Sequence, residues 1–260
     1  MCPPAPQNAA VSVLAATAAE SVRHVDVSQQ DCIAFLRTLP DESVDVIVTD
    51  PAYSGMNQHM KFGHGRIVGH YGKQGNDKWF TEFRDDPETF RTLLFECRRV
   101  LRDGRHVYIM FDSFSLLTLG HLVREFFDVK CLIVWDKVNL GMGHYFRRRH
   151  EQIVFAGKGR RKLSRRDLAD VWAVRRLHRA AYPTQKPVEL FQRMLTGSAE
   201  PGHVVCDPFV GSGSSAVAAL RQQCDFVGAD IDPRAVELTR SRCRSVLLTG
   251  RDPLERAAAS

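Results

Sequence analysis

The stretch Val204–Gly213, VVCDPFVGSG, decides the fold of this chain of 260 residues. Its first three residues are an apolar run typical of a short buried strand, which ends in Asp207 and then breaks into glycine and serine. Glycine adopts positive φ and lets the backbone approach a ligand, as at the first strand-to-helix turn of a doubly wound sheet. A helical run, Ser214–Arg221, and a second strand, Phe226–Asp230, follow. This order predicts an α/β fold.

The acid that ends the second strand is a candidate ligand for ribose. Asp230 follows the glycine loop at about the 20-residue distance where such folds place a carboxylate on ribose hydroxyls. The third glycine of the dinucleotide fingerprint is missing, because Ser214 and Ser215 directly follow Gly213. A mononucleoside ligand is therefore a better match than NAD. The alternative is an ordinary turn that binds no ligand.

A second motif, Thr49-Asp50-Pro51-Ala52-Tyr53, follows the apolar strand Val44–Val48. Asp50 thus ends a strand, at the edge where open α/β sheets bind ligands. Its carboxylate and the carbonyl of Pro51 are suited to accept the two protons of an amino group, and Tyr53 is suited to stack on a ring. These groups suit chemistry on the exocyclic amine of a nucleic-acid base. Such a base must leave the duplex to be reached, and an aromatic partner replaces the stacking that it loses. The alternative is a proline-containing turn with Tyr53 in the core.

These two motifs, in this order, resemble those of amino-methylating DNA methyltransferases, in the group whose catalytic motif precedes the cofactor motif. The match runs from about Asp31 to about Arg242 and includes a further segment, Tyr182–Pro187, YPTQKP. The resemblance implies a Rossmann-like methyltransferase fold with a doubly wound, mostly parallel seven-stranded sheet and an antiparallel edge hairpin. It also implies S-adenosylmethionine as cofactor and double-stranded DNA as partner.

The resemblance assigns roles to single residues. Asp31 is expected at the cofactor adenine, and Thr184 and Lys186 are expected near the methionine end. The remaining expected cofactor residues are those of the glycine loop and the ribose acid: Asp207, Phe209, Gly211, Gly213 and Asp230. The expected catalytic residues are Asp50, Pro51 and Tyr53. Ala52 replaces the second proline that is usual in this motif, which frees one φ angle and softens the loop.

An aspartate at the first motif position is commoner in enzymes that act on adenine N6, and serine is commoner in cytosine N4 enzymes. Asp50 therefore favours a site-specific adenine N6 methyltransferase, with a cytosine N4 enzyme as the alternative. A catalytically silent DNA-binding protein on the same scaffold is a third reading, for which Ala52 is the hint, and RNA stays open as a substrate. Methylation of cytosine at C5 needs a thiolate nucleophile, and the resemblance to enzymes of that kind would be a Pro-Cys dipeptide. None of the seven cysteines follows a proline, so this chemistry is excluded.

Positive charge is concentrated in one part of the chain. The net charge is +6 overall, yet twelve Lys or Arg and three acids lie between Arg147 and Arg179. Such a stretch is typical of contact with a phosphate backbone, although most charge runs are solvated surface. We expect a small target-recognition insertion at 157–181 and a short or relaxed recognition sequence. The candidate DNA-binding residues are Arg147, Arg148, Arg149, Arg160, Arg161, Lys162, Arg165 and Arg166.

A glycine-rich segment, 54–83, directly follows the catalytic motif and is expected to be a lid or DNA loop. It contains His59, His64 and His70, which could ligate a metal, but no cysteine accompanies them and their spacing fits no zinc pattern. We therefore expect no metal site.

The methyltransferase domain is expected at 23–250, between a flexible tail at 1–22 and a C-terminal tail at 251–260. The N-terminus lacks the early Lys or Arg of a secretion signal and is too short in apolar run to span a bilayer. Seven cysteines without a Cys-x-x-Cys indicate reduced thiols, so we expect a cytoplasmic protein of bacterial, archaeal or phage origin that does not bind a membrane. The resemblance suggests a homodimer, and a cognate restriction enzyme is a candidate partner.

Between the motifs, helical and extended patterns alternate as a doubly wound fold requires. The expected elements are a helix at Pro87–Leu101 with a stop at Asp103-Gly104, a strand at Arg105–Phe111, a helix at Phe114–Phe126 and an edge hairpin of Val129–Trp135 with Gln152–Ala156.

Overall fold

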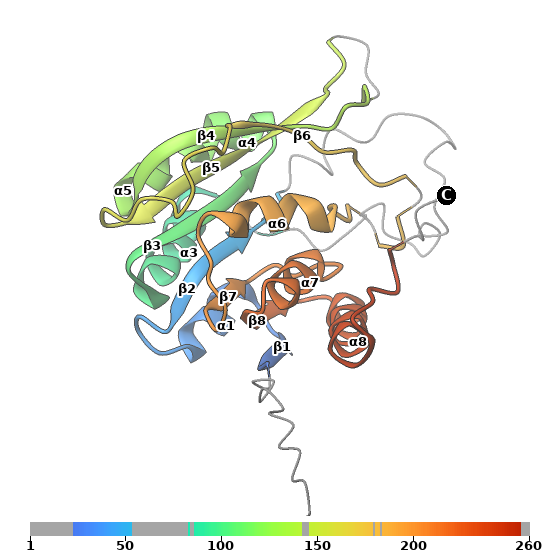
Figure 1. Ribbon diagram of the computed structural model, residues 1–260. Coiled ribbons are helices and arrows are strands. Elements are labelled where there is room, and N and C mark those ends of the chain that lie inside the picture. The colour runs from blue at the N-terminus through green and yellow to red at the C-terminus, as the bar shows by residue number, and fades with distance from the viewer. Residues whose placement is uncertain are drawn as a thin grey trace, which may run out of the picture.

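The computed structural model describes residues 23–53, 83, 86–141, 146–178, 180–182 and 184–255, and structural statements below concern these residues. Their centre is an eight-stranded sheet in the order β1-β8-β7-β2-β3-β5-β4-β6 (Figure 1). The strands are β1 (Val25–Gln29), β2 (Val44–Thr49), β3 (Leu101–Phe111), β4 (Asp128–Asp136), β5 (His150–Lys158), β6 (Val171–Ala173), β7 (Val204–Asp207) and β8 (Asp225–Asp230).

The strand directions confirm the predicted mostly parallel α/β sheet with an antiparallel hairpin. Strands β1, β8, β7, β2 and β3 are parallel, and β5 runs antiparallel to both β3 and β4. The described sheet has eight strands where we expected seven. The additional strand is β6, which pairs in parallel with β4 and lies inside the expected insertion 157–181.

Strands β2 and β7 lie side by side at the point where the chain changes direction along the sheet. The chain leaves β2 toward β3 on one side and leaves β7 toward β8 on the other. Ligands of open α/β sheets bind in the crevice beyond the carboxyl ends of strands at such a switch point. Asp50 directly follows β2 and Asp207 ends β7, so both motifs reach this crevice.

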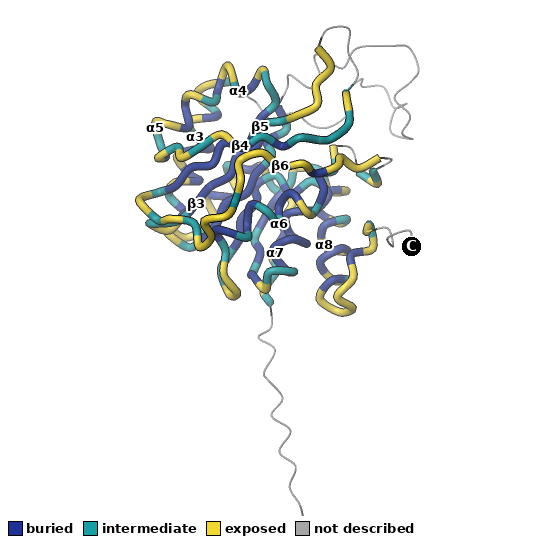
Figure 2. Tube along the Cα trace, turned by 45° about the horizontal axis from the view of Figure 1, so that its top comes forward, coloured by how far each residue is buried: buried dark blue, intermediate teal, exposed yellow. Residues whose placement is uncertain are grey.

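Helices cover both faces of the sheet, as Figure 1 shows. Helices α6, α7 and α8 share one hydrophobic core with Val46 and Val48 of β2, while α1, α3 and the helices after β3 share the other core with Ile47. All six residues of β2 are buried, which fits a strand covered on both sides (Figure 2). The helices are α1 (Cys32–Thr38), α3 (Pro87–Val100), α4 (Ser113–Leu119), the 3-10 helix η1 (Gly120–Leu122), α5 (Val123–Phe126), α6 (Val188–Thr196), α7 (Ser214–Arg221) and α8 (Pro233–Thr249).

Two local expectations need correction. The helix α3 ends at Val100, and the expected stop at Asp103-Gly104 lies instead within β3. The helix expected at Phe114–Phe126 is divided into α4, η1 and α5. In both cases the expectation rested on local sequence propensity. Strand pairing and tertiary packing override such propensity.

The first residues of the expected C-terminal tail, 251–260, pack against the domain. Asp252 is 5% exposed and forms a two-bond ion pair with Arg242 of α8, at 2.9 and 2.6 Å. The expected tails at 1–22 and at 256–260, and all of the expected lid except Phe83, lie outside the described residues. None of the helices in the described ranges is long and apolar enough to cross a membrane.

Candidate active site

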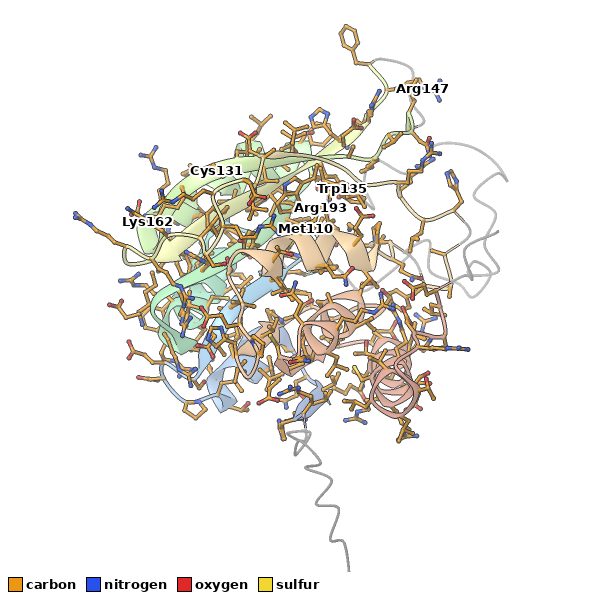
Figure 3. All side chains as sticks on the ribbon, in the orientation of Figure 1. Met110, Cys131, Trp135, Arg147, Lys162 and Arg193 are labelled. Carbon is orange, nitrogen blue, oxygen red and sulfur yellow. The ribbon has the colours of Figure 1, made fainter. Side chains whose placement is uncertain are left out.

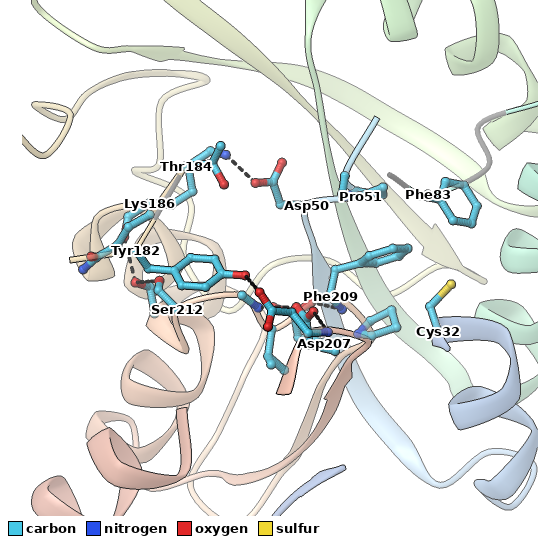
Figure 4. A pocket seen from close by; sticks show the side chains of 18 of the residues that line it. Cys32, Asp50, Pro51, Phe83, Tyr182, Thr184, Lys186, Asp207, Phe209 and Ser212 are labelled. Carbon is cyan, nitrogen blue, oxygen red and sulfur yellow. Dashed lines mark hydrogen bonds and ion pairs between the residues drawn. The ribbon is translucent and has the colours of Figure 1, made fainter. Parts of the chain in front are cut away.

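A pocket lies at the carboxyl ends of the parallel strands and brings both motifs together (Figure 4). Asp50, Pro51 and Phe83 border it on one side, and Asp207 and Phe209 border it on another. Three helices begin at its wall, because Asp31, Asp112 and Asp232 line the pocket and cap α1, α4 and α8. Thr184 and Lys186 of the YPTQKP segment also reach the pocket.

The glycine loop is fixed to the strand beside it through Asp230. One carboxylate oxygen of Asp230 accepts the backbone N–H of Gly211 at 2.9 Å, and the other accepts that of Asp232 at 2.9 Å. Gly211 has φ +49°, a conformation that favours glycine. Burial raises the pKa of Asp230. Each oxygen keeps a second lone pair, so Asp230 remains suited to accept a ribose hydroxyl.

Asp207, at the end of β7, holds the glycine loop through hydrogen bonds. It is buried and accepts the backbone N–H of Phe209 at 3.0 Å and the hydroxyl of Ser215 at 2.6 Å. Burial raises the pKa of Asp207 to about 7, although both hydrogen bonds oppose this. Both oxygens are thus engaged within the protein, which makes Asp207 a support of the loop as well as part of the pocket wall.

Gly213 does not line the pocket, in contrast to the other loop residues that we expected there. It has φ +82° and stands at the N-cap of α7. A Cβ built on it would lie 2.7 Å from Oγ1 and 3.0 Å from the Cα of Thr239. A glycine is therefore required at position 213 by the close approach of α8 as well as by the positive φ.

We expect Gly213→Ala to destabilise the protein by about 1–3 kcal/mol more than a matched glycine replacement, because a methyl group there overpacks the contact with α8. The matched control is Gly202→Ala, since Gly202 has φ +83° and no neighbour within 4 Å of a built Cβ. Denaturant unfolding of both variants measures the difference. Equal destabilisation would assign the whole effect to backbone strain and contradict the steric role.

Asp31 and Thr184 both line the pocket. The Oδ1 of Asp31 accepts the backbone N–H groups of Ile33 and Ala34 at 3.0 and 3.1 Å, so this acid both caps α1 and borders the pocket. Thr184 has φ +58°, which is rare for a β-branched residue. Backbone strain of this kind gathers at ligand sites, and Thr184 is exposed at such a site.

Asp50 forms an ion pair with Lys186, which approaches from the segment before α6. Lys186 is buried, and the side chain of Asp50 is 26% exposed. Burial raises the pKa of Asp50, and the ammonium of Lys186 opposes that rise. Burial alone would lower the pKa of Lys186, but Asp50 and Glu151 hold it above its ordinary value. The expected catalytic acid and the expected cofactor lysine are thus partners.

The rest of the catalytic motif is more tightly packed than we expected. Tyr53 lines the pocket but is 4% exposed, and its ring stacks on Phe111 with centroids 5.4 Å apart. The carbonyl of Pro51 already accepts the backbone N–H of Tyr53 at 2.9 Å, which leaves one lone pair for a substrate. In this structure Tyr53 therefore packs in the core while it lines the pocket.

Glu151 is a further residue of the pocket, and Lys137 is its partner. Glu151 lies near the start of β5 and lines the pocket, and its Oε1 pairs with Lys137, which follows β4. Its Oε2 lies 4.0 Å from the ammonium of Lys186. The available signal was an acid directly before the expected strand Gln152–Ala156, within the most basic part of the chain.

The expected DNA-binding residues divide between two ends of the sheet. Arg147 and Arg149 precede β5 on the side of the pocket, whereas Lys162 lies at the opposite end (Figure 3). The reason is the antiparallel direction of β5, which pairs Gln152 with Phe111 at one end and Lys158 with Arg105 at the other. The residues thus placed away from the pocket are Arg160, Arg161, Lys162, Arg165 and Arg166.

Several of the basic residues also have partners within the protein. Arg149 donates two hydrogen bonds to Asp136, both at 2.6 Å, and lowers the pKa of that acid to about 2. The guanidinium of Arg148 lies 4.7 Å from the ring centroid of Phe114. Arg161 and Arg165 pair with Glu200 and Asp167. The positive charge of the stretch is therefore partly neutralised by local acids.

A family model for DNA methylases, N6_N4_Mtase, matches residues 44–241, which is most of the chain and includes both motifs. The chain belongs to this family. It is therefore a DNA methyltransferase of the N6/N4 class, as the resemblance indicated, and DNA is its substrate. Family membership also confirms the predicted cofactor, S-adenosylmethionine, which supplies a sulfonium-bound methyl group. The backbone at Gly211, the ring of Phe209 and the carboxylate of Asp230 provide a fitting nucleoside pocket.

Known proteins similar to this N6/N4 methylase span nearly all of it. The Type II methyltransferase M2.MboI of Moraxella bovis is 24% identical over 249 residues, which cover 86% of this chain and 89% of the relative. The structure of TTHA0409 from Thermus thermophilus, complexed with S-adenosyl-L-methionine, has a TM-score of 0.60 at 20% identity and covers 89% of this chain and 98% of that chain. The cytosine-N4-specific PvuII DNA methyltransferase has a TM-score of 0.62 at 12% identity and covers 88% of this chain and 94% of that chain. At these identities the structural likeness shows a shared fold.

Proposed function

We propose that this methylase transfers a methyl group to the exocyclic N6 amine of a flipped adenine in double-stranded DNA, at a short or relaxed recognition sequence. The observation that carries the proposal is the placement of Asp50 and the glycine loop at the ends of the neighbouring strands β2 and β7. This arrangement sets an amine acceptor beside a nucleoside pocket, which is the geometry that transfer between the two requires.

The residues of the catalytic motif act on the protons of the amine. The lone pair of an exocyclic amine is delocalised into the ring, so acceptors that draw its protons out of the ring plane make the nitrogen a better nucleophile. Asp50 offers a carboxylate, and the carbonyl of Pro51 offers its remaining lone pair. The target base must leave the DNA duplex to reach them, because a base inside the duplex is stacked and its amine is paired.

Adenine is favoured over cytosine by the aspartate at position 50, through the resemblance to N6 enzymes. Cytosine N4 remains the second candidate, because its amine presents two protons to the same acceptors and the structurally similar PvuII DNA methyltransferase is cytosine-N4-specific. The choice between the bases therefore depends on the product and not on the catalytic groups.

The DNA surface that we propose is the end of the sheet that carries the pocket. Arg147 and Arg148 lie there before β5. Arg175 and Arg176 follow β6, which runs parallel to β4 and so carries them to the same end, where both are exposed. Arginine contacts of this kind position a protein on the phosphate backbone. A homodimer and a cognate restriction enzyme remain predictions.

The deciding experiment incubates unmethylated DNA with the protein and S-adenosylmethionine that carries a labelled methyl group, and then analyses the nucleosides by mass spectrometry. We expect labelled N6-methyladenine. Labelled N4-methylcytosine would keep the mechanism and replace the base. Absence of label from every base would contradict the proposal and favour the silent DNA-binding protein or an RNA substrate, which the same assay with RNA distinguishes.

A further inference from the structure

Four charged side chains form a continuous line, of which Asp50, Lys186 and Glu151 line the pocket. Asp50 pairs with Lys186, the ammonium of Lys186 lies 4.0 Å from Oε2 of Glu151, and Oε1 of Glu151 pairs with Lys137. The side chains of Lys186, Glu151 and Lys137 are all less than one fifth exposed. Two acids and two lysines alternate, so the line is neutral and each charge has an opposite neighbour.

The line weakens Asp50 for its proposed task, because the hydrogen bond and the positive charge of Lys186 make the carboxylate a poorer acceptor and a poorer base. The Oδ2 of Asp50 accepts a hydrogen bond from Lys186, and an incoming base amine needs an acceptor on the same carboxylate. A buried lysine that loses its acid partner leaves an uncompensated charge, which strongly destabilises the protein unless another acid pairs with it. Glu151 is placed to be that acid, because its Oε2 faces Lys186 while its Oε1 is held by Lys137.

We propose that Glu151 is a positioning residue for methyl transfer: it receives the ammonium of Lys186 when the target amine enters, and so releases Asp50 for the amine. This inference rests on the proposed function. The movement required is small, from a separation of 4.0 Å to hydrogen-bond distance. Lys137 keeps Glu151 in place and ionised, since Lys186 and Lys137 outweigh the effect of burial and lower the pKa of Glu151.

The transfer step then balances with groups on this chain. The lone pair of the amine nitrogen forms the new bond to the methyl carbon as the bond from that carbon to sulfur breaks with its electrons on sulfur. The nitrogen thereby gains a positive charge, and its proton passes to the carboxylate of Asp50. Lys186, held by Glu151, stays close enough to stabilise Asp50 as a carboxylate until that moment.

Other charged groups face this line and must be counted in its titration. Asp112, which follows β3, acts on Lys186, and Arg148, which precedes β5, acts on Glu151. Asp207, at the end of β7, is electrostatically coupled to Asp50. None of these groups changes in the variants below, so each comparison isolates the charge that is removed.

The first test measures the pKa of Asp50 by carbon-13 NMR of protein labelled at the aspartate carboxyl carbon, with Asp50→Asn to assign the signal. Glu151→Gln removes a negative charge and keeps the shape, so we expect the pKa of Asp50 to fall by about one pH unit. Lys137→Met leaves the charge of Glu151 unopposed, so we expect the pKa to rise. Glu42→Gln removes the acid partner of Lys158 at the other end of the sheet and is expected to change nothing.

The second test measures kcat against pH. Glu151→Gln should lower the plateau at least about tenfold, because Lys186 stays on Asp50, and should move the acidic limb to lower pH. The KM values for DNA and cofactor should change less than about threefold. A general loss of structure would change these KM values as well as kcat. The inference would be overturned by an unchanged kcat in Glu151→Gln. It would also be overturned if the pKa of Asp50 were the same in the wild type, Glu151→Gln and Lys137→Met. If the wild type transfers no methyl group, the proposed function fails while the NMR titration still decides the coupling.

Discussion

The Asp50→Asn variant is expected to lose methyl transfer by about 10²- to 10⁴-fold while it binds S-adenosylmethionine almost as the wild type does. Asparagine keeps the shape of the side chain and can accept one proton of the amine through its oxygen. It cannot take the proton that the nitrogen releases, and it carries no charge to stabilise the nitrogen as it becomes positive. The loss therefore appears in the chemical step.

The structure explains why cofactor affinity should survive this change. Asp50 makes no hydrogen bond to the glycine loop among the described residues, whereas Asp207 and Asp230 hold that loop through Phe209, Ser215 and Gly211. Lys186 loses one acid partner and keeps Glu151 as the other. The cofactor pocket is thus supported by residues that the substitution leaves in place.

Single-turnover transfer of a labelled methyl group measures the rate, and calorimetric titration with S-adenosylmethionine measures the affinity. Asp128→Asn serves as the matched control, because Asp128 is an exposed acid that pairs with Lys130 away from the pocket. A parallel loss of rate and of cofactor affinity in Asp50→Asn would show that the acid supports the pocket and would contradict its catalytic role.

The fold and the meeting of the two motifs could be predicted because both depend on local sequence. VVCDPFVGSG contains its own strand, turn and helix start, and Val44–Asp50 contains another strand with an acid at its end. Parallel strands bring their carboxyl ends to one edge, so residues that follow them must gather there. No knowledge of side-chain packing was needed for that step.

The partners of Asp50 could not be predicted in this way. Lys186 is 136 residues away along the chain, and its approach depends on how α6 packs against β2. Glu151 belongs to a strand whose place between β3 and β4 no local pattern reveals. The positions of the basic residues could not be predicted for a related reason: a count of charges has no direction, and the direction of β5 carries residues such as Lys162 away from the pocket.

The Asp252→Ala variant is expected to lose about 3–5 kcal/mol of stability, because it leaves the guanidinium of Arg242 buried without its acid partner. The side chains of Arg242 and Asp252 are 1% and 2% exposed. For a domain of this size such a loss lowers the melting temperature by about 10 °C. The control is Glu255→Ala in the same segment, whose acid pairs with Arg221 at the surface and should contribute at most about 1 kcal/mol. Similar melting temperatures for the two variants would contradict the importance of the buried pair.

Arg242 has a second contact that separates stability from function. Its Nη1 donates to the backbone carbonyl of Ser212 at 2.5 Å, within the glycine loop. Replacing both partners, as Arg242→Met with Asp252→Leu, removes the buried charges together and should restore most of the stability that Asp252→Ala loses. The same double variant leaves the Ser212 carbonyl without its donor, so cofactor affinity should remain reduced. If the double variant instead recovers both stability and affinity, the pair serves the fold alone, and the loop is held sufficiently by Asp207, Asp230 and Thr239.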